Sequence, residues 1–306
     1  MIFNPDRKHI EIIAYEAFLR RAASTDLPFM LKGSYLTRQY FANPEDRIPN
    51  DIDWVYINGR LDHKEEAVAS FEKWVTDISE LHGNDGVKFR SFRENPFWRQ
   101  IDYAMDDDFP TTSTDLDCEV DGETGPPCRI DISFNLPINI DGVFLQYKPL
   151  RGTAFNIENT APLALQVSWK LHQTLVRPRY KDLFDLMHLV IHPAFTADTL
   201  QITLRELERE CALDNTDPLR LNYLLNGGWD ELFYQNSSAR TWEIWRHGQL
   251  HLLEGYDVYN DIAIEITNPD KLPETLTEFK ELFSAAFRRA GFYSVDFNQV
   301  FGLGLL

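Results

Sequence analysis

The feature that most constrains the fold is a short unit of strand, Gly-Ser turn, helix and strand near the N-terminus. Residues 28–31 are an apolar run that stops at Gly33, as a strand does when it enters a turn. Ser34 is placed to cap a helix over residues 35–41. Residues 51–57, a second apolar segment, then predict the next strand.

Two aspartates lie in this second strand. Side chains two residues apart on a strand point to the same side, so Asp51 and Asp53 present both carboxylates to one face while Ile52 enters the core. Two like charges so close are costly unless a cation lies between them, and Mg²⁺ prefers such hard oxygen ligands. Asp131 is another acid, on the apolar strand predicted at residues 129–135, and a neighbouring strand would place it beside the pair. Three such carboxylates can hold two metal ions about 4 Å apart, the spacing used in phosphoryl and nucleotidyl transfer.

The Gly-Ser turn suits a phosphate. A turn between strand and helix exposes backbone N–H groups and the positive end of the helix dipole. Gly33 lets the backbone approach a ligand closely, and the Ser34 hydroxyl can reach a terminal phosphate oxygen.

The two halves of the chain differ in predicted secondary structure. Apolar periodicity predicts helices at residues 8–24, 63–82, 162–176, 179–192, 197–213 and 273–290. Gly291 follows the last of these in the usual C-terminal capping position. Extended segments are predicted at residues 87–94, 97–105 and 129–135. These elements predict an α+β fold, with a mixed α/β domain over residues 1–158 and a mainly helical domain over residues 159–306.

Charge limits the partners of this 306-residue chain. A net charge of −18 disfavours a broad, sequence-independent grip on nucleic acid, which depends on basic side chains, although it leaves a local basic groove open. Much of the acidity lies between Arg99 and Arg129, where no basic residue occurs. This run predicts a solvated loop or hairpin. A calcium site there is the alternative, but the spacing of an EF-hand loop is absent.

Cysteine usage and hydropathy indicate the compartment. Cys118, Cys128 and Cys211 lack metal-ligand spacing, so reduced structural thiols are expected, with a Cys118–Cys128 disulfide as the alternative. The sequence lacks the long apolar segment that a membrane span or a secretion signal needs. We therefore expect a cytoplasmic protein.

Several motifs, in this order, resemble a known family. The sequence LKGS followed by DIDWVYI resembles the polymerase-β-like nucleotidyltransferases, and more closely the AbiEii/AbiGii-type (MenT-like) toxins of bacterial abortive-infection and toxin–antitoxin systems. Arg47 lies four residues before Asp51, as in the R-x-S-x-D-x-D pattern of these proteins, although Pro49 replaces the usual Ser or Thr. Residues 168–189 resemble the family's helix lysine followed by R-D-L-x-D-L, with Lys181 where Arg is common. The strand RIDISFN lies between the two, as the central-strand acid does.

The resemblance implies a polymerase-β-like fold and a role for each matching residue. Nucleotide would be bound by Gly33, Ser34, Arg47, Lys170 and Asp185. Metal, Mg²⁺ or Mn²⁺, would be held by Asp51, Asp53 and Asp131. Catalysis would depend on Asp51, Asp53, Lys170 and Asp182. Asp182 is favoured over Asp185 as the acid of the last motif because it follows a basic residue.

The resemblance also implies an activity. The protein would transfer NMP from an NTP to an acceptor, most simply an RNA 3′ end such as that of tRNA, release pyrophosphate, and be neutralised by a cognate antitoxin. Transfer of AMP to a protein or a small molecule, and a non-catalytic nucleotide- or partner-binding module, are the alternatives. The basic residues Arg177, Arg179 and Lys181 fit either substrate phosphates or helix-end charge.

Overall fold

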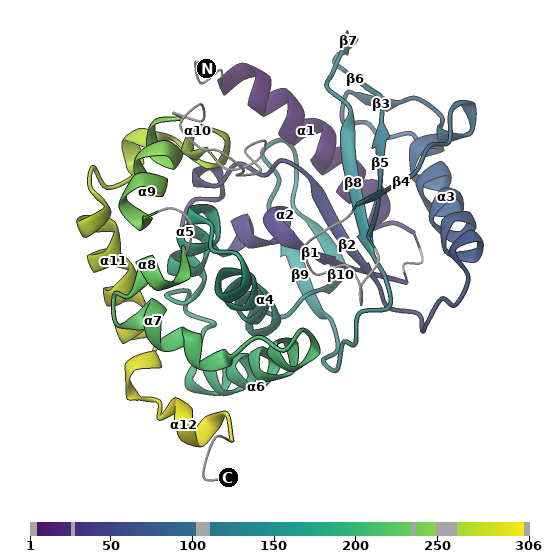
Figure 1. Cartoon of the computed structure of the whole chain (residues 1–306). Coiled ribbons are helices and arrows are strands. Elements are labelled where there is room, and N and C mark those ends of the chain that lie inside the picture. The colour runs from purple at the N-terminus through teal and green to yellow at the C-terminus, as the bar shows by residue number, and fades with distance from the viewer. Residues whose placement is uncertain (1–4, 26–27, 102–110, 234–236, 249–261, 303–306) are drawn as a thin grey trace. The chain divides into compact units, whose positions relative to one another are not determined.

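The computed structural model describes residues 5–25, 28–101, 111–233, 237–248 and 262–302 (Figure 1). The chain forms two compact units: a sheet unit of residues 2–39 and 48–161, and a helical unit that contains residues 40–47 and 162–306. Residues 40–47 therefore interrupt the sheet unit. Each unit is described by itself.

The sheet unit contains all the described strands and the N-terminal helices. Its strands are β1 (Phe29–Lys32), β2 (Ile52–Tyr56), β3 (Val87–Phe89), β4 (Arg99–Ile101), β5 (Thr111–Leu116), β6 (Cys118–Val120), β7 (Glu123–Thr124), β8 (Cys128–Ser133), β9 (Val143–Tyr147) and β10 (Phe155–Thr160). Its helices are α1 (Pro5–Ala22), α2 (Gly33–Thr37) and α3 (Lys64–Glu80). Seven strands form one mixed sheet in the order β4-β5-β8-β2-β1-β10-β9, and β3, β6 and β7 form a smaller one. The pairs β2–β8 and β1–β10 are parallel, and the other pairs are antiparallel.

One face of the large sheet is apolar and packs against α3. The Phe29 ring stacks on Trp74 of α3 with 4.1 Å between centroids, and Trp54 meets the same ring edge-on at 5.3 Å. All three side chains are nearly or fully buried. Because side chains alternate along a strand, Lys32 and Asp53 project from the opposite face.

The predicted start of the second helix was wrong by two residues. α2 begins at Gly33, its N-cap is Lys32, and no side chain caps it. Ser34 therefore lies inside the first turn, and its hydroxyl donates instead to the backbone oxygen of Asp51 at 3.3 Å. The α-helix is also shorter than predicted, because it ends at Thr37. The next residues, Arg38–Tyr40, form a 3₁₀ turn.

The acidic run, predicted as a solvated loop or hairpin, does contain a hairpin, since β6 and β7 pair antiparallel around residues 121–122. It forms β5, β6 and β7, and β5 lies inside the large sheet between β4 and β8. The first four residues of β5, TTST, are buried although they are polar. The sequence therefore has no apolar pattern there that would predict a strand. Residues 102–110 of the run lie outside the described part. The strands β9 and β10 were not predicted either.

The helical unit has helices at all four predicted positions, and five further described helices were not predicted. Its helices are α4 (Leu163–Val176), α5 (Tyr180–Leu189), α6 (Ala197–Leu213), α7 (Leu221–Leu225), α8 (Trp229–Leu232), α9 (Ser238–His247), α10 (Ala263–Ile266), α11 (Leu276–Arg289) and α12 (Phe297–Val300). Tyr180 lies in an aromatic core, 5.0 Å from the Phe233 ring and 5.2 Å from the Trp242 ring. Gly291, at φ +91°, confirms the predicted stop after α11. Together with the mixed sheet, these helices confirm the α+β class.

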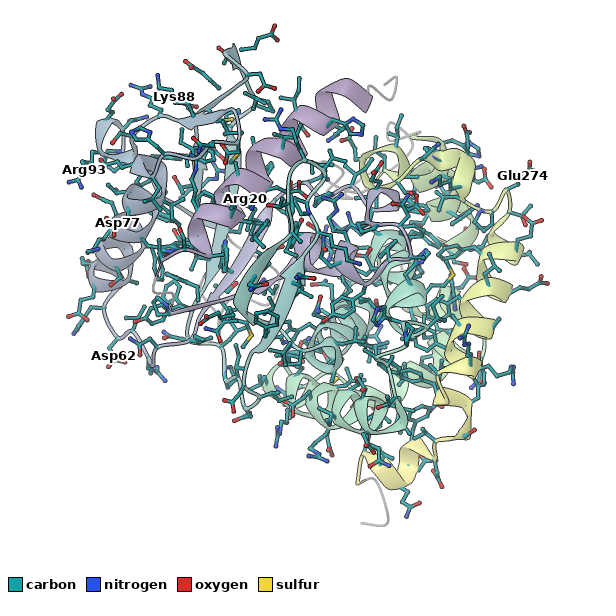
Figure 2. All side chains as sticks on the ribbon, turned by 180° about the vertical axis from the view of Figure 1, so that it is seen from behind. Arg20, Asp62, Asp77, Lys88, Arg93 and Glu274 are labelled. Atoms are coloured by element: carbon teal, nitrogen blue, oxygen red, sulfur yellow. The ribbon has the colours of Figure 1, made fainter. Side chains whose placement is uncertain are left out.

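Charged side chains cover the outside of α3. Figure 2 labels Asp77 and Arg93, which pair with Lys73 at 2.5 Å and with Glu80 at 2.6 Å. The three cysteines are buried and free, as expected for structural thiols. In the described ranges, no helix has the length and apolar character that crossing a membrane requires.

Candidate functional site

A row of polar side chains crosses four neighbouring strands of the large sheet. The register pairs Lys32 with Asp53, Asp53 with Asp131, and Asp131 with Ser113. Paired residues on adjacent strands share a face, so these four side chains lie in line. The expectation that a neighbouring strand places Asp131 beside Asp53 is therefore confirmed.

Gly33 makes room for the Asp53 carboxylate. Gly33 has φ +71°, and a Cβ atom at this position would come within 1.9 Å of Asp53 Oδ2. Asp53 Oδ1 lies 3.5 Å from the Lys32 ammonium. The glycine is thus required twice, by a left-handed backbone and by the aspartate packed against it.

Asp131 is the most buried of these carboxylates. It is 2% exposed, and its Oδ1 accepts hydrogen bonds from Ser113 Oγ at 2.5 Å and from Arg129 Nε at 3.2 Å. Burial, and next the negative charge of Asp53, raise the pKa of Asp131, while Arg129 and Ser113 only partly offset them. The ionised pair of Asp53 and Asp131 therefore favours a cation beside it.

Asp51 lies just before β2 and is half-buried. Its backbone oxygen accepts the Ser34 hydroxyl, so the Gly-Ser turn and the start of the aspartate strand are joined. Across the residues that the structure describes, no group of three or more His, Cys, Asp or Glu side chains is arranged as a metal-ligand set. Asp53 and Asp131 form the carboxylate pair that the register defines.

The helical unit holds the second group of predicted residues. Arg47 binds Asp185 through two hydrogen bonds, from Nε to Oδ1 at 2.6 Å and from Nη2 to Oδ2 at 3.1 Å. Lys170 Nζ lies 2.7 Å from Asp185 Oδ2 and 3.4 Å from Asp182 Oδ1. Arg179 donates to Asp182 Oδ2 at 2.6 Å. This network, which we call the basic cluster, joins residue 47 to α4 and α5.

Electrostatics keep both aspartates of the basic cluster ionised. Burial by itself would raise their pKa values, but the charges of Arg179 and Lys170 lower the pKa of Asp182, and those of Arg47 and Lys170 lower that of Asp185. Asp185 is 0% exposed and Arg47 only 4% exposed. The cations Arg47, Lys170 and Arg179 thus surround the carboxylates of Asp182 and Asp185.

Three contributors to these groups were missed in the sequence. Lys32 directly precedes Gly33, and its pairing with Asp53 depends on an antiparallel register that periodicity does not set. Ser113 lies in the acidic run, in a polar segment that was not predicted to be a strand. Arg129 lies two residues before Asp131 in β8, and its contact with that carboxylate is visible only in the folded strand. A cavity of about 580 Å³ also lies in the sheet unit, with Met30, Arg60 and Asn159 in its lining and none of the predicted site residues.

Comparison with known proteins gives a family and a fold. The family model described as nucleotidyl transferase AbiEii toxin, type IV toxin–antitoxin system, matches residues 17–254. The solved structure of MenT4, a nucleotidyltransferase toxin from Mycobacterium tuberculosis H37Rv, is similar to this chain with a TM-score of 0.55 and 13% sequence identity. The similarity covers 97% of this chain and 89% of MenT4. No curated protein matches the sequence.

Proposed function

Since the chain belongs to the AbiEii family of nucleotidyltransferase toxins, we propose that it transfers NMP from an NTP to an acceptor hydroxyl and releases pyrophosphate. In this reaction a bond forms between the acceptor oxygen and the α-phosphorus, and the bond from that phosphorus to the pyrophosphate oxygen breaks. The observation that carries the proposal is the pairing of Asp53 with Asp131 on β2 and β8, next to Gly33.

The carboxylates fit a divalent cation such as Mg²⁺ or Mn²⁺. Asp53 and Asp131 are hard oxygen ligands on one face of the sheet. Burial and the negative charge of Asp53 raise the pKa of Asp131, and a cation beside the pair would oppose this shift. We assign Asp51, Asp53 and Asp131 to the metal. When bound, Mg²⁺ would neutralise charge that develops on the transferred phosphate.

The remaining predicted residues would bind and orient the nucleotide. Gly33 and Ser34 would contact its phosphates, and Lys170 would supply a compact positive charge. Asp182 and Asp185 hold the Lys170 ammonium in one place, with Arg47 anchoring Asp185. We therefore assign Arg47 and Asp185 a nucleotide-binding role that acts through Lys170. Asp182 remains our choice for the acid of the last motif.

The domain assignment extends this proposal. Residues 1–158 would form the nucleotidyltransferase domain, and residues 159–306 would complete the active site by supplying Lys170. Residues 40–47 depart from this linear division, since they group with the helical unit.

The acceptor that we propose is an RNA 3′ end such as that of tRNA, in a cytoplasmic toxin controlled by a cognate antitoxin. One observation favours a second candidate: a net charge of −18 repels RNA at long range. That candidate is AMP transfer to a protein or a small molecule.

Labelling tests the activity and identifies the acceptor. The protein is incubated with each α-labelled NTP, Mg²⁺, and either total RNA or total protein. We expect label on RNA, and a loss of at least about 100-fold in Asp53→Asn, because changes one shell further out already cost 10–100-fold. Asp77→Asn, which removes an exposed charge on α3, is the matched control (Figure 2). Equal labelling by wild type and Asp53→Asn would refute the proposed site. Label on protein alone would show that the acceptor is a protein and not RNA.

A further inference from the structure

One buried hydroxyl joins the segments that lead to the carboxylates. Tyr15 of α1 is 5% exposed. Its hydroxyl oxygen accepts a hydrogen bond from the backbone N–H of Arg129 at 2.8 Å and donates one to the backbone oxygen of Asn50 at 3.0 Å. Asn50 directly precedes Asp51, and Arg129 lies two residues before Asp131.

This bridge lies at the entrance to the β2–β8 pairing. The first paired residues of these parallel strands are Ile52 and Ile130, so Asn50 lies before the ladder begins. Tyr15 therefore extends the connection between the two strands beyond their own pairing. Partly buried backbone groups need such a partner, because an unpaired group there is destabilising.

We infer that Tyr15 is a positioning residue. It sets the spacing between Asp131 on β8 and the segment that carries Asp51, just before β2, and Asp53, on β2. The inference rests on the proposed metal site. The hydrogen bonds of the Tyr15 hydroxyl go to backbone atoms, so it acts through the backbone that carries these residues.

The chain offers a closely matched control. The Tyr35 ring lies 5.2 Å from the Tyr15 ring and is 0% exposed. Its hydroxyl is buried and makes no hydrogen bond within the described residues. Tyr15→Phe and Tyr35→Phe each remove one buried oxygen from the same region, but only Tyr15→Phe breaks the bridge.

Mn²⁺ affinity measured by electron paramagnetic resonance tests the inference without requiring activity. We expect Tyr15→Phe to bind Mn²⁺ about 10-fold more weakly, as is typical when a supporting group is lost, and to have a lower kcat with little change in the NTP KM. Tyr35→Phe should match wild type in both. Replacement of Tyr15 by p-aminophenylalanine, which restores a hydrogen-bonding group at this place, should recover most of the affinity and also serves if Tyr15→Phe does not fold.

The outcomes separate this inference from the proposed function. If Asp53→Asn weakens Mn²⁺ binding but Tyr15→Phe lowers only the melting temperature, Tyr15 is merely structural and the inference is overturned. If Asp53→Asn leaves Mn²⁺ binding unchanged, the metal site itself is wrong. Weaker binding in both, with rescue by p-aminophenylalanine, supports both.

Discussion

Gly33 shows how one missing atom shapes the candidate site. A Cβ at this position would overlap Asp53 Oδ2, so the Gly-Ser turn and the aspartate strand are sterically coupled. From the sequence, this glycine is expected to let the backbone approach a phosphate closely. The structure adds that a carboxylate of the same chain already occupies the space where a side chain would be.

Gly33→Ala should therefore displace Asp53 and abolish most of the nucleotidyl transfer, by at least about 100-fold. Gly59→Ala is the control, because Gly59 also has positive φ, +84°, but no atom lies within 4 Å of its added Cβ. Both changes carry a similar backbone penalty of about 1–2 kcal/mol. Transfer rate and melting temperature are measured for both. Equal activities at equal stabilities would contradict the coupling.

Asp185 should contribute to stability in a pH-dependent way. Its folded pKa is lowered below the ordinary 3.8, so its contribution is complete above that value and disappears as pH falls through the lowered one. Asp185→Asn should reduce the free energy of unfolding by about 3–5 kcal/mol near neutral pH, because Arg47 and Lys170 lose a buried partner.

Urea unfolding between pH 7 and pH 3 checks this prediction. The difference between wild type and Asp185→Asn should be constant down to about pH 5 and should shrink below about pH 4. Asp77→Asn, in the exposed pair with Lys73, should cost at most about 1 kcal/mol. A difference that grows in acid would contradict the assignment.

The strand β5 illustrates how an element can escape sequence analysis and still supply the site. Its buried residues are Thr and Ser, apart from Leu116 at its end. The hydroxyls of these Thr and Ser residues make hydrogen bonds to β8 side chains or to the backbone of residues 97 and 99. Ser113 makes a hydrogen bond to Asp131. Two residues further along the same pair of strands, the hydroxyls of Thr111 and Ser133 are hydrogen-bonded at 3.0 Å. Neither bond is visible until the strands are placed side by side.

Ser113→Ala should raise the pKa of Asp131 further, because the Ser113 hydrogen bond favours the ionised carboxylate. A cation needs that ionised form, so the pH at which Mn²⁺ affinity is half-maximal should move upward. Mn²⁺ titrations at several pH values measure this midpoint. Ser133→Ala removes the neighbouring hydroxyl pair and should leave the midpoint unchanged. An unshifted midpoint in Ser113→Ala would show that Asp131 does not govern binding.

In the whole molecule, the chain passes back and forth between the two units, so neither unit is one continuous segment of sequence. The polypeptide leaves the sheet unit after residue 39, returns at residue 48, and leaves again after residue 161. Residues 40–47 are anchored in the helical unit by the buried Arg47–Asp185 pair and by the hydrogen bond from Thr267 to the Asp46 backbone oxygen. Because residues 40–47 of the helical unit interrupt the sheet unit, we expect the two units to unfold together.

Pulsed thiol labelling with mass spectrometry can follow both units in one urea series. Cys118 and Cys128 are buried in the sheet unit, and Cys211 is buried in the helical unit. All three should become reactive at the same urea concentration, and Arg47→Ala should separate the midpoints by weakening the anchor. Separate midpoints in the wild type would contradict cooperative unfolding.

The sequence alone determined the helical second half, the Gly-Ser turn, the aspartate strand and the family resemblance, because these depend on periodicity and on spacing within short segments. Tertiary structure decided what those residues touch. It set Asp53 against Asp131 and Gly33, recruited Lys32 and Ser113, and placed Arg47 on Asp185. These contacts join residues far apart in the chain, and strand register, which fixes them, leaves no local pattern when the paired residues are polar.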